Sequence, residues 1–179
     1  HKARSRRAPP ALNVWTIRRE RDGDEAAIAH VIAAAFAGVE WSDGSEARIV
    51  DRLRDSLELE ASYVAVTPSG SVVGHIAFSP VTIDGVDCGW FGLGPLVVLP
   101  DWQRRGIGAA LVTAGLEDLQ RVEAAGCVVL GQPDYYTRFG FAHDPALTYP
   151  GAPVAEYFQR LMLGGEPLRG VVTYSPAFG

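Results

Sequence analysis

The stretch from Leu96 to Leu111 reads LVVLPDWQRRGIGAAL, and the fold can be worked out from it. Its first four residues are wholly apolar, as in a strand that is covered on both faces. A Pro-Asp pair ends that strand, and apolar residues then recur at helical spacing from about Gly106 to Glu123. The stretch therefore predicts a buried strand, a short loop and a helix whose first turn contains glycine.

The loop before this helix has the chemistry of an anion site. The first amides of a helix have no partners inside it, and its N-terminus carries about half a positive charge. Gly106 and Gly108 allow a phosphate to approach the backbone, while Arg104 and Arg105 can add charge-assisted hydrogen bonds. The spacing is not that of a P-loop, and the third glycine of the dinucleotide fingerprint is missing. Because any α/β protein can have a glycine in a strand-to-helix turn, these residues alone do not establish a phosphate ligand.

Before this stretch, the chain changes from helical to strand-like patterns. A strand-like run at 14–17 precedes two helical patterns, the first closed by Gly38 and the second capped by the hydroxyl of Ser45. Three strand-like runs, at 63–66, 72–81 and 88–99, are joined by turn sequences. They predict an antiparallel meander.

After the long helix, the pattern predicts a second buried strand. Gly126 ends the helix, and residues 127–130 form the short apolar run expected of a central strand, so strand, helix and strand form a parallel βαβ unit. A short helix is expected at 154–161 and a final strand at 171–174. The edge of that last strand could pair across a homodimer.

Composition bounds the class of protein. The 179 residues, 47% hydrophobic and 21% charged, fit one domain at 13–179, after a basic tail at 1–12 that is disordered or vector-derived. Without the four basic residues Lys2, Arg4, Arg6 and Arg7, the formal charge of −5 becomes −9, which argues against a nucleic-acid surface and favours cationic substrates. Two cysteines outside any CxxC pair indicate a reducing compartment such as the cytoplasm. No apolar run approaches the roughly 20 residues that span a membrane.

A second motif makes the interpretation specific. Residues 136–141 read YTRFGF and follow the strand after the long helix. The run QRRGIGA at 103–109, directly after LVVLP, resembles the acetyl-CoA pyrophosphate loop of the GNAT superfamily of N-acetyltransferases, and YTRFGF resembles the family's Tyr-x-x-x-Gly-Phe segment. With the surrounding layout, the resemblance extends over about residues 13–175. It implies an α/β fold with a mixed, mostly antiparallel central sheet that contains a parallel βαβ unit and is flanked by helices.

The resemblance also implies which residues bind the cosubstrate, acetyl-CoA. In the family, backbone groups of the strand before the loop hold the pantetheine arm and polarise the acetyl carbonyl, and loop amides take the pyrophosphate. The two central strands, at 96–99 and 127–130, would splay apart to admit acetyl-CoA. The residues that match are Leu96, Val97, Val98, Arg104, Arg105, Gly106, Ile107, Gly108 and Ala109. No metal is expected.

Tyr136 matches the tyrosine that protonates the departing CoA thiolate in the family. A phenol suits this role, because a pKa near 10 keeps it protonated at neutral pH while it can still give a proton to a developing thiolate. Its aromatic neighbours also fit a core position. We expect a catalytic role for Tyr136.

The chain departs from the family pattern at the general base. Many relatives carry a Glu on or beside a central strand and an Asn ahead of the tyrosine, but residues 128–130 and 131–134 offer neither. Glu40, Glu46, His75 or a water chain could take the role. His75 lies in an apolar run, which favours a structural histidine.

The expected reaction is direct transfer of an acetyl group from acetyl-CoA to a primary amine of a small molecule, peptide or protein, without a covalent acyl-enzyme. An α-amine has a pKa near 8 and a lysine amine a pKa near 10.4, so more of the α-amine is neutral at pH 7. An α-amine therefore depends less on a general base. The acceptor pocket is expected from segments 36–56 and 149–174, with acidic Glu40, Asp43 and Glu46 and a candidate aromatic wall of Trp41, Tyr149, Tyr157 and Phe158. The alternatives are a CoA-binding regulatory module without catalysis and a structural domain without a cofactor.

Overall fold

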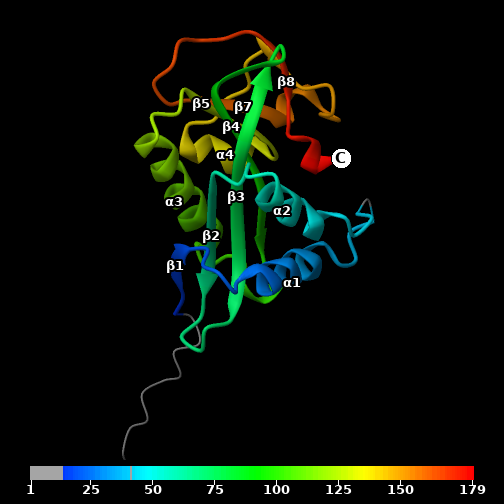
Figure 1. The fold of residues 1–179 in the computed structure, drawn as a ribbon, viewed down its shortest axis with the longest axis vertical. Coiled ribbons are helices and arrows are strands. Elements are labelled where there is room, and N and C mark those ends of the chain that lie inside the picture. Colours follow the sequence, from blue (N-terminus) through cyan, green and yellow to red (C-terminus); the bar gives the residue numbers. More distant parts are fainter. Residues whose placement is uncertain (1–13, 41) are drawn as a thin grey trace, which may run out of the picture.

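A central sheet organises the protein in a computed structural model that describes residues 14–40 and 42–179. Within these residues the sheet has eight strands, six of them in the order β1-β2-β3-β4-β5-β7 (Figure 1). The β4–β5 pair is parallel and the other pairs along this path are antiparallel, which confirms the mixed, mostly antiparallel sheet. The strands are β1 (Thr16–Arg19), β2 (Ala61–Val66), β3 (Val72–Ile83), β4 (Val86–Val98), β5 (Gly126–Leu130), β6 (Leu147–Thr148), β7 (Phe158–Met162) and β8 (Gly170–Thr173).

Helices cover both faces of this sheet. Figure 1 shows α3 on one side of the strands and α1 and α2 on the other. Helix α3 packs against β2 and β3, and α1 packs against β3 and α2. The α-helices are α1 (Glu25–Phe36), α2 (Glu46–Asp55), α3 (Ile107–Arg121) and α4 (Pro133–Tyr136), and the short 3-10 helices lie at Pro100–Trp102, Thr137–Phe139, Ala155–Tyr157 and Pro176–Phe178.

Helix α3 buries most of the apolar face that its periodicity predicted. Ile107, Leu111 and Leu119 of α3 join one buried cluster, which also contains Phe78 of β3. The Phe78 ring comes so close to α3 that a Cβ at Gly115 would lie 2.0 Å from it. Removing this apolar surface from water is the main favourable contribution to folding, so α3 is held firmly on the sheet.

A bulge in β4 separates β4 from β5. Ile76 of β3 is opposite Leu96 and Phe78 is opposite Leu93, so two residues of β4, Gly94 and Pro95, face a single residue of β3. The parallel pairing of β4 with β5 runs only from Trp90 to Leu93, opposite Gly126 to Val129. Beyond the bulge, residues 96–98 pair with β3 alone. The two strands therefore separate beyond Leu93 and Val129, close to where the family resemblance implied.

The sequence prediction is wrong at the end of α3 and at residues 154–161. Helix α3 ends at Arg121, and Glu123 (φ 55°), not Gly126, takes the left-handed conformation after it. Gly126 instead begins β5. It has no side chain, which leaves room for the Trp90 ring, because a Cβ added at Gly126 would lie 2.4 Å from that ring. The predicted helix at 154–161 is wrong: a 3-10 turn leads into β7, which pairs with all five residues of β5. One edge of β5 pairs with β4, and the backbone groups on its other edge would lack hydrogen-bond partners without β7. Pairing with β5 therefore outweighs the helical spacing of residues 158–161.

Two smaller expectations are also wrong. Ser45 occupies the N-cap of α2, but its side chain makes no cap hydrogen bond, because its backbone is helical (φ −79°, ψ −15°) instead of extended. β8 is not a free edge for a second copy of the chain, because it pairs with β3 and with β6. The basic tail at 1–12 and Trp41 lie outside the described residues. In the described ranges, no helix has the length and apolar character needed to cross a membrane.

His75 is buried between the sheet and the α1–α2 face. It is 0% exposed and pairs with Val64 and Val97, which pack in the cluster formed by these helices. Its Nε2 lies 2.8 Å from the Ser62 hydroxyl, which donates to Glu20 at 3.3 Å. Its Nδ1 has no partner in the described part of the chain. Burial, with a further contribution from the nearby Arg54 cation, lowers the pKa of His75 to about 3.

This burial predicts a loss of stability in mild acid. The unfolded chain, with a histidine pKa near 6.5, takes up a proton below that pH that folded His75 does not accept. The free energy of unfolding should therefore fall by about 2 kcal/mol between pH 7 and pH 5 through this residue alone. Urea denaturation should show that His75→Gln removes this part of the pH slope. Identical slopes for the two proteins would contradict the burial of a neutral His75.

Candidate functional site

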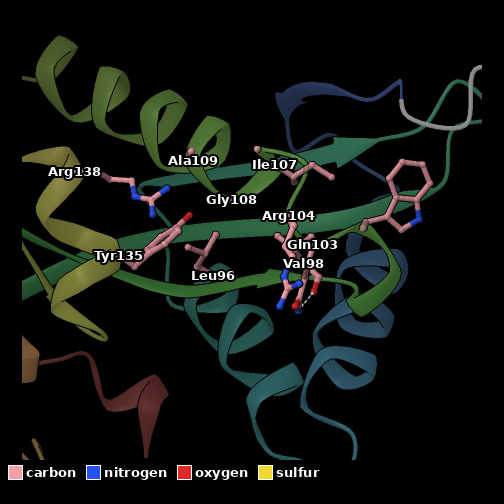
Figure 2. A pocket seen from close by; sticks show the side chains of 11 residues that line it. Leu96, Val98, Gln103, Arg104, Ile107, Gly108, Ala109, Tyr135 and Arg138 are labelled. Atoms are coloured by element: carbon pink, nitrogen blue, oxygen red, sulfur yellow. Dashed lines mark hydrogen bonds between the residues drawn. The ribbon is translucent and has the colours of Figure 1, made fainter.

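A cavity of about 430 Å³ lies at the N-terminus of α3 (Figure 2). Its walls come from the end of β4, the loop after it, the first turn of α3, and α4 with the turn that follows. The lining residues are Leu96, Val98, Trp102, Gln103, Arg104, Gly106, Ile107, Gly108, Ala109, Tyr135 and Arg138. Two of these carry a positive charge and none is acidic, so the cavity favours an anionic ligand.

The backbone at the start of α3 presents unpaired amides. Gly106 is the N-cap and has a left-handed backbone (φ 81°) that a residue with a side chain adopts only with strain. The amides from Gly106 to Ala109 donate to no other group within residues 14–40 and 42–179. Arg104 is also left-handed (φ 62°), a conformation that costs of order 1 kcal/mol outside glycine and that recurs where loops clamp ligands. These features match an anion-binding helix terminus.

Side chains hold the loop in this shape. Gln103 donates from Nε2 to the Val98 carbonyl at 3.2 Å, which ties the loop to the end of β4. Arg105 donates to the Asp101 carbonyl at 3.0 Å, and its guanidinium lies 4.7 Å from the centroid of the Trp102 ring. Arg105 therefore braces the loop instead of lining the cavity. Val97 does not line it either, because its side chain is buried (5% exposed) on the α1–α2 face. The other residues expected for the cosubstrate do line it.

Tyr136 lies beside the point where β4 and β5 separate. Its ring is nearly buried (8% exposed) and packs against Gly131, just beyond β5, where a Cβ would meet the ring at 2.4 Å. Burial raises the pKa of the Tyr136 phenol, with smaller contributions from Tyr135 and Cys127. The hydroxyl makes no hydrogen bond within the described residues. It is not fully buried either, so it retains contact with solvent.

Tyr135 and Arg138 also line the cavity, although the two family motifs do not indicate either of them as a ligand contact. A Cβ at Gly108 would meet the Tyr135 hydroxyl at 2.5 Å, so this hydroxyl reaches the first turn of α3. The Arg138 guanidinium lies 4.5 Å from the centroid of the Tyr135 ring. The signal was their spacing of three residues, which places two side chains on one side of a helical turn.

The candidate bases lie elsewhere. Glu40, Glu46 and His75 do not line the cavity, and the Glu46 carboxylate accepts a hydrogen bond from the Ser42 hydroxyl at 2.8 Å. His75 has no exposed surface from which to take a proton from a substrate. Over 14–40 and 42–179, no cluster of three or more His, Cys, Asp or Glu side chains could hold a metal ion.

An aromatic group gathers in the C-terminal region expected for the acceptor. The Tyr149 ring lies 5.4 Å from Phe158 and 5.0 Å from Tyr174, between ring centroids. Tyr149 and Phe158 line a second cavity of about 390 Å³, and Tyr157 does not. The structure thus brings two of the predicted aromatic residues together.

Comparisons with known proteins agree with this geometry. The family model for the acetyltransferase (GNAT) domain matches residues 58–143. The uncharacterized N-acetyltransferase YhbS of Escherichia coli K12 is 38% identical over 135 residues, which are 73% of this chain and 80% of YhbS. Among solved structures, a GNAT family acetyltransferase from Brucella melitensis in complex with acetyl-CoA is 44% identical (TM-score 0.82). The match covers 93% of this chain and 99% of the Brucella chain. YhbS from E. coli in complex with CoA is 32% identical (TM-score 0.85), with 96% and 95% covered.

Fold and sequence similarity thus lead to the same family. The similar proteins are matched over most of their length, and the GNAT family model covers the β4 strand, the α3 loop and the YTRFGF motif. The chain belongs to the GNAT superfamily of N-acetyltransferases and is an acyltransferase.

Proposed function

We propose that the protein transfers the acetyl group of acetyl-CoA directly to a primary amine. The observation that carries this proposal is the cationic cavity at the start of α3, which opens beside the gap between β4 and β5. Its unpaired amides and glycines suit a pyrophosphate. The similar proteins from Brucella melitensis and E. coli, whose structures contain acetyl-CoA and CoA respectively, support acetyl-CoA as the acetyl donor. Nothing observed favours a CoA-binding module without catalysis.

The gap beside β4 suits the pantetheine arm. Residues 96–98 pair with β3 on one side only, which leaves backbone donors and acceptors on the other side for a ligand, except that the Val98 carbonyl already accepts from Gln103. Pantetheine carries two amides, and an extended chain with amides can pair with such an edge in the manner of an added strand. We assign this contact to the backbone of Leu96, Val97 and Val98. Because the contact uses main-chain groups, the outward turn of the Val97 side chain does not affect it.

Tyr136 supplies the proton that the leaving sulfur needs. In the transfer, the amine nitrogen bonds to the acetyl carbon while the carbon–sulfur bond breaks. The Tyr136 hydroxyl gives its proton to the sulfur, and the nitrogen, which is cationic after it attacks, loses one of its two protons to water and keeps the other as the amide N–H. Because burial raises the pKa of Tyr136, the phenol is fully protonated at neutral pH. Solvent later returns the proton to Tyr136.

The chain's thiols are poorly suited to a covalent acyl-enzyme. Cys127 is fully buried, and burial raises its pKa, so it does not form the thiolate that a nucleophile requires. Burial also raises the pKa of half-buried Cys88. Direct attack by the amine is the simpler reaction. The two free thiols also support a reducing compartment, and we propose the cytoplasm.

No acidic side chain lines the cavity, so water is our candidate for the base. A base of this kind favours amines that are partly neutral near pH 7, such as an α-amine, over a lysine side chain. We propose that the acceptor is such an amine, on a small molecule or on a peptide or protein.

Glu at position 108 should abolish cosubstrate binding. Gly108→Glu places a carboxylate against the amides that would hold the pyrophosphate, and the fold should survive because the new Cβ meets only the hydroxyl end of the Tyr135 side chain and no backbone. Acetyl-CoA at 100 times its Kd should stabilise the wild type by about 2.7 kcal/mol in a thermal-shift titration. The variant should show no shift.

A matched variant controls for added charge. Thr113 is exposed on the same helix, outside the cavity, so Thr113→Glu should keep the wild-type shift. If Gly108→Glu responds to acetyl-CoA as the wild type does, the assignment of the α3 N-terminus is wrong.

Loss of the Tyr136 hydroxyl should slow transfer without weakening binding. In Tyr136→Phe we expect kcat to fall by about 100-fold, because the sulfur must leave without general-acid help, while the Kd for acetyl-CoA stays within about twofold. Labelled acetyl-CoA with a panel of peptide α-amines, lysine amines and small amines measures this on the best acceptor. Tyr136 does not itself line the cavity, but it packs on Gly131 beside the gap between β4 and β5. Tyr63→Phe is the control, because Tyr63 is equally buried (8% exposed) but belongs to β2, which does not border that gap. A wild-type kcat in Tyr136→Phe would exclude this role.

A further inference from the structure

Gln159 is a polar side chain buried in the core of the protein. It belongs to β7, pairs with Val129 of β5 and is only 1% exposed. Glutamine is rarely buried this completely, because an amide that leaves water without hydrogen bonds is costly. Its Nε2 donates to the Gly131 carbonyl at 3.3 Å, and its Oε1 has no partner in the described part of the chain. The side-chain hydrogen bond that the structure shows for Gln159 therefore ends on the residue that follows β5.

This hydrogen bond replaces one that the pairing of β5 with β7 does not make. The Gly131 N–H donates to the Tyr157 carbonyl at 2.9 Å, which continues the antiparallel pairing one residue beyond β5. In a regular antiparallel pair, the Tyr157 N–H would donate back to the Gly131 carbonyl. It donates instead to the Val154 carbonyl at 3.0 Å, in the 3-10 turn before β7. Gln159 supplies the donor that the Gly131 carbonyl would otherwise lack.

The same glycine supports the Tyr136 ring. A Cβ at Gly131 would overlap the ring at Cε2 and lie 3.4 Å from Cζ, the carbon that carries the hydroxyl. The hydroxyl end of the ring therefore lies directly against the Gly131 backbone. The carbonyl that Gln159 binds also belongs to the peptide that leads into α4, the helix that ends with Tyr136. Because packed interiors transmit small shifts, a turn of this peptide would move the phenol.

We propose that Gln159 is a positioning residue for Tyr136: its amide fixes the Gly131 peptide, and this peptide holds the phenol where it can protonate the leaving sulfur. The inference rests on the acid role of Tyr136 in the proposed function. A general acid must lie within hydrogen-bond reach of its target, so a small displacement of the hydroxyl lowers the rate. Gln159 does not line the cavity at the start of α3, so it should not affect the binding of acetyl-CoA.

Gln159→Met tests the proposal, because methionine has a similar length but no hydrogen-bond donor. We expect kcat to fall by about tenfold, less than in Tyr136→Phe, because the acid is displaced but still present. The Kd for acetyl-CoA, measured by calorimetry, should stay within about twofold of the wild-type value. A wild-type kcat in the folded Gln159→Met protein would overturn the proposal.

A second variant of β7 controls for lost stability. Met162 pairs with Gly126 at the far end of the strand and packs in the cluster that contains Trp90, whereas Tyr136 belongs to another cluster. Met162→Ala should lower the melting temperature and keep the wild-type kcat. If it slows transfer as much as Gln159→Met does, the effect comes from a weakened strand and the positioning role is wrong.

Gln159→Glu offers a rescue that depends on pH. A protonated carboxyl can donate its O–H to the Gly131 carbonyl, whereas a carboxylate cannot. Burial raises the pKa of a carboxyl, so the kcat of this variant, divided by the wild-type kcat at the same pH, should rise from about pH 8 to about pH 6. The same ratio for Gln159→Met should stay constant. A Gln159→Glu ratio as low as that of Gln159→Met at the lower pH would contradict the need for a donor.

An NMR signal reports the position of the phenol without turnover. With isotope-labelled tyrosine, the Cζ signal of Tyr136 can be assigned by its absence from Tyr136→Phe. This signal should shift in Gln159→Met and keep its wild-type position in Met162→Ala. An unchanged signal in Gln159→Met would show that the ring has not moved, and it would overturn the proposal.

A double-mutant cycle tests whether Gln159 acts through Tyr136. In the Tyr136→Phe background, Gln159→Met should lower kcat no further, because the hydroxyl that it positions is gone. Additive losses would show that Gln159 acts in another way. If Tyr136→Phe alone keeps the wild-type kcat, the proposed acid role is wrong. If Tyr136→Phe slows transfer and Gln159→Met does not, only the positioning role is wrong.

Discussion

The site depends on the gap that opens where β4 and β5 stop forming hydrogen bonds with each other. Their parallel pairing ends at Leu93 and Val129, because the bulge at residues 94–95 turns the end of β4 away. Unpaired backbone groups are costly when they are buried, and an edge that stays open inside a sheet needs water or a ligand to satisfy it. The gap thus supplies the shape and the polar groups that an extended amide-containing arm can use.

The α3 N-terminus and Tyr136 both lie beside the gap between β4 and β5. The loop after β4 leads into α3, so the helix N-terminus lies at one end of the gap. Gly131 follows β5 and lets the Tyr136 ring pack directly on the backbone beside the gap. Buried contacts hold these parts still: α3 is fixed by Phe78 against Gly115, and β5 by Trp90 against Gly126. The proposed cosubstrate site is therefore built mainly from backbone geometry, with glycines where aromatic rings pack against the backbone of α3, β5 and the residue after β5.

This dependence on backbone explains what could be predicted from the sequence. Glycines at 106 and 108, directly after a buried strand, indicate an anion site because few other residues allow that geometry. The apolar run at 127–130 is typical of a covered strand, and three of its four residues are buried. By contrast, residues 158–162 read FQRLM, which fits a helix or a strand, and only the open edge of β5 decided for a strand. Val97 and Arg105 sit within the motif, yet their side chains face away from the cavity, a direction that a motif does not contain. Tyr135 reaches the cavity by packing on Gly108, so the three-residue spacing of Tyr135 and Arg138 indicates a shared side of a turn but not the element that this side faces.

Hydrogen exchange with and without acetyl-CoA tests the central claim most directly. If acetyl-CoA binds in the gap between β4 and β5 and against the α3 N-terminus, amide exchange should slow in peptides that cover residues 94–99 and 103–110. Exchange in the distant β1–β2 pair should not change, since neither strand lines the cavity. Unchanged exchange at 94–99 and 103–110, with protection elsewhere in the sheet, would contradict the claim that the separation of β4 from β5 forms the site.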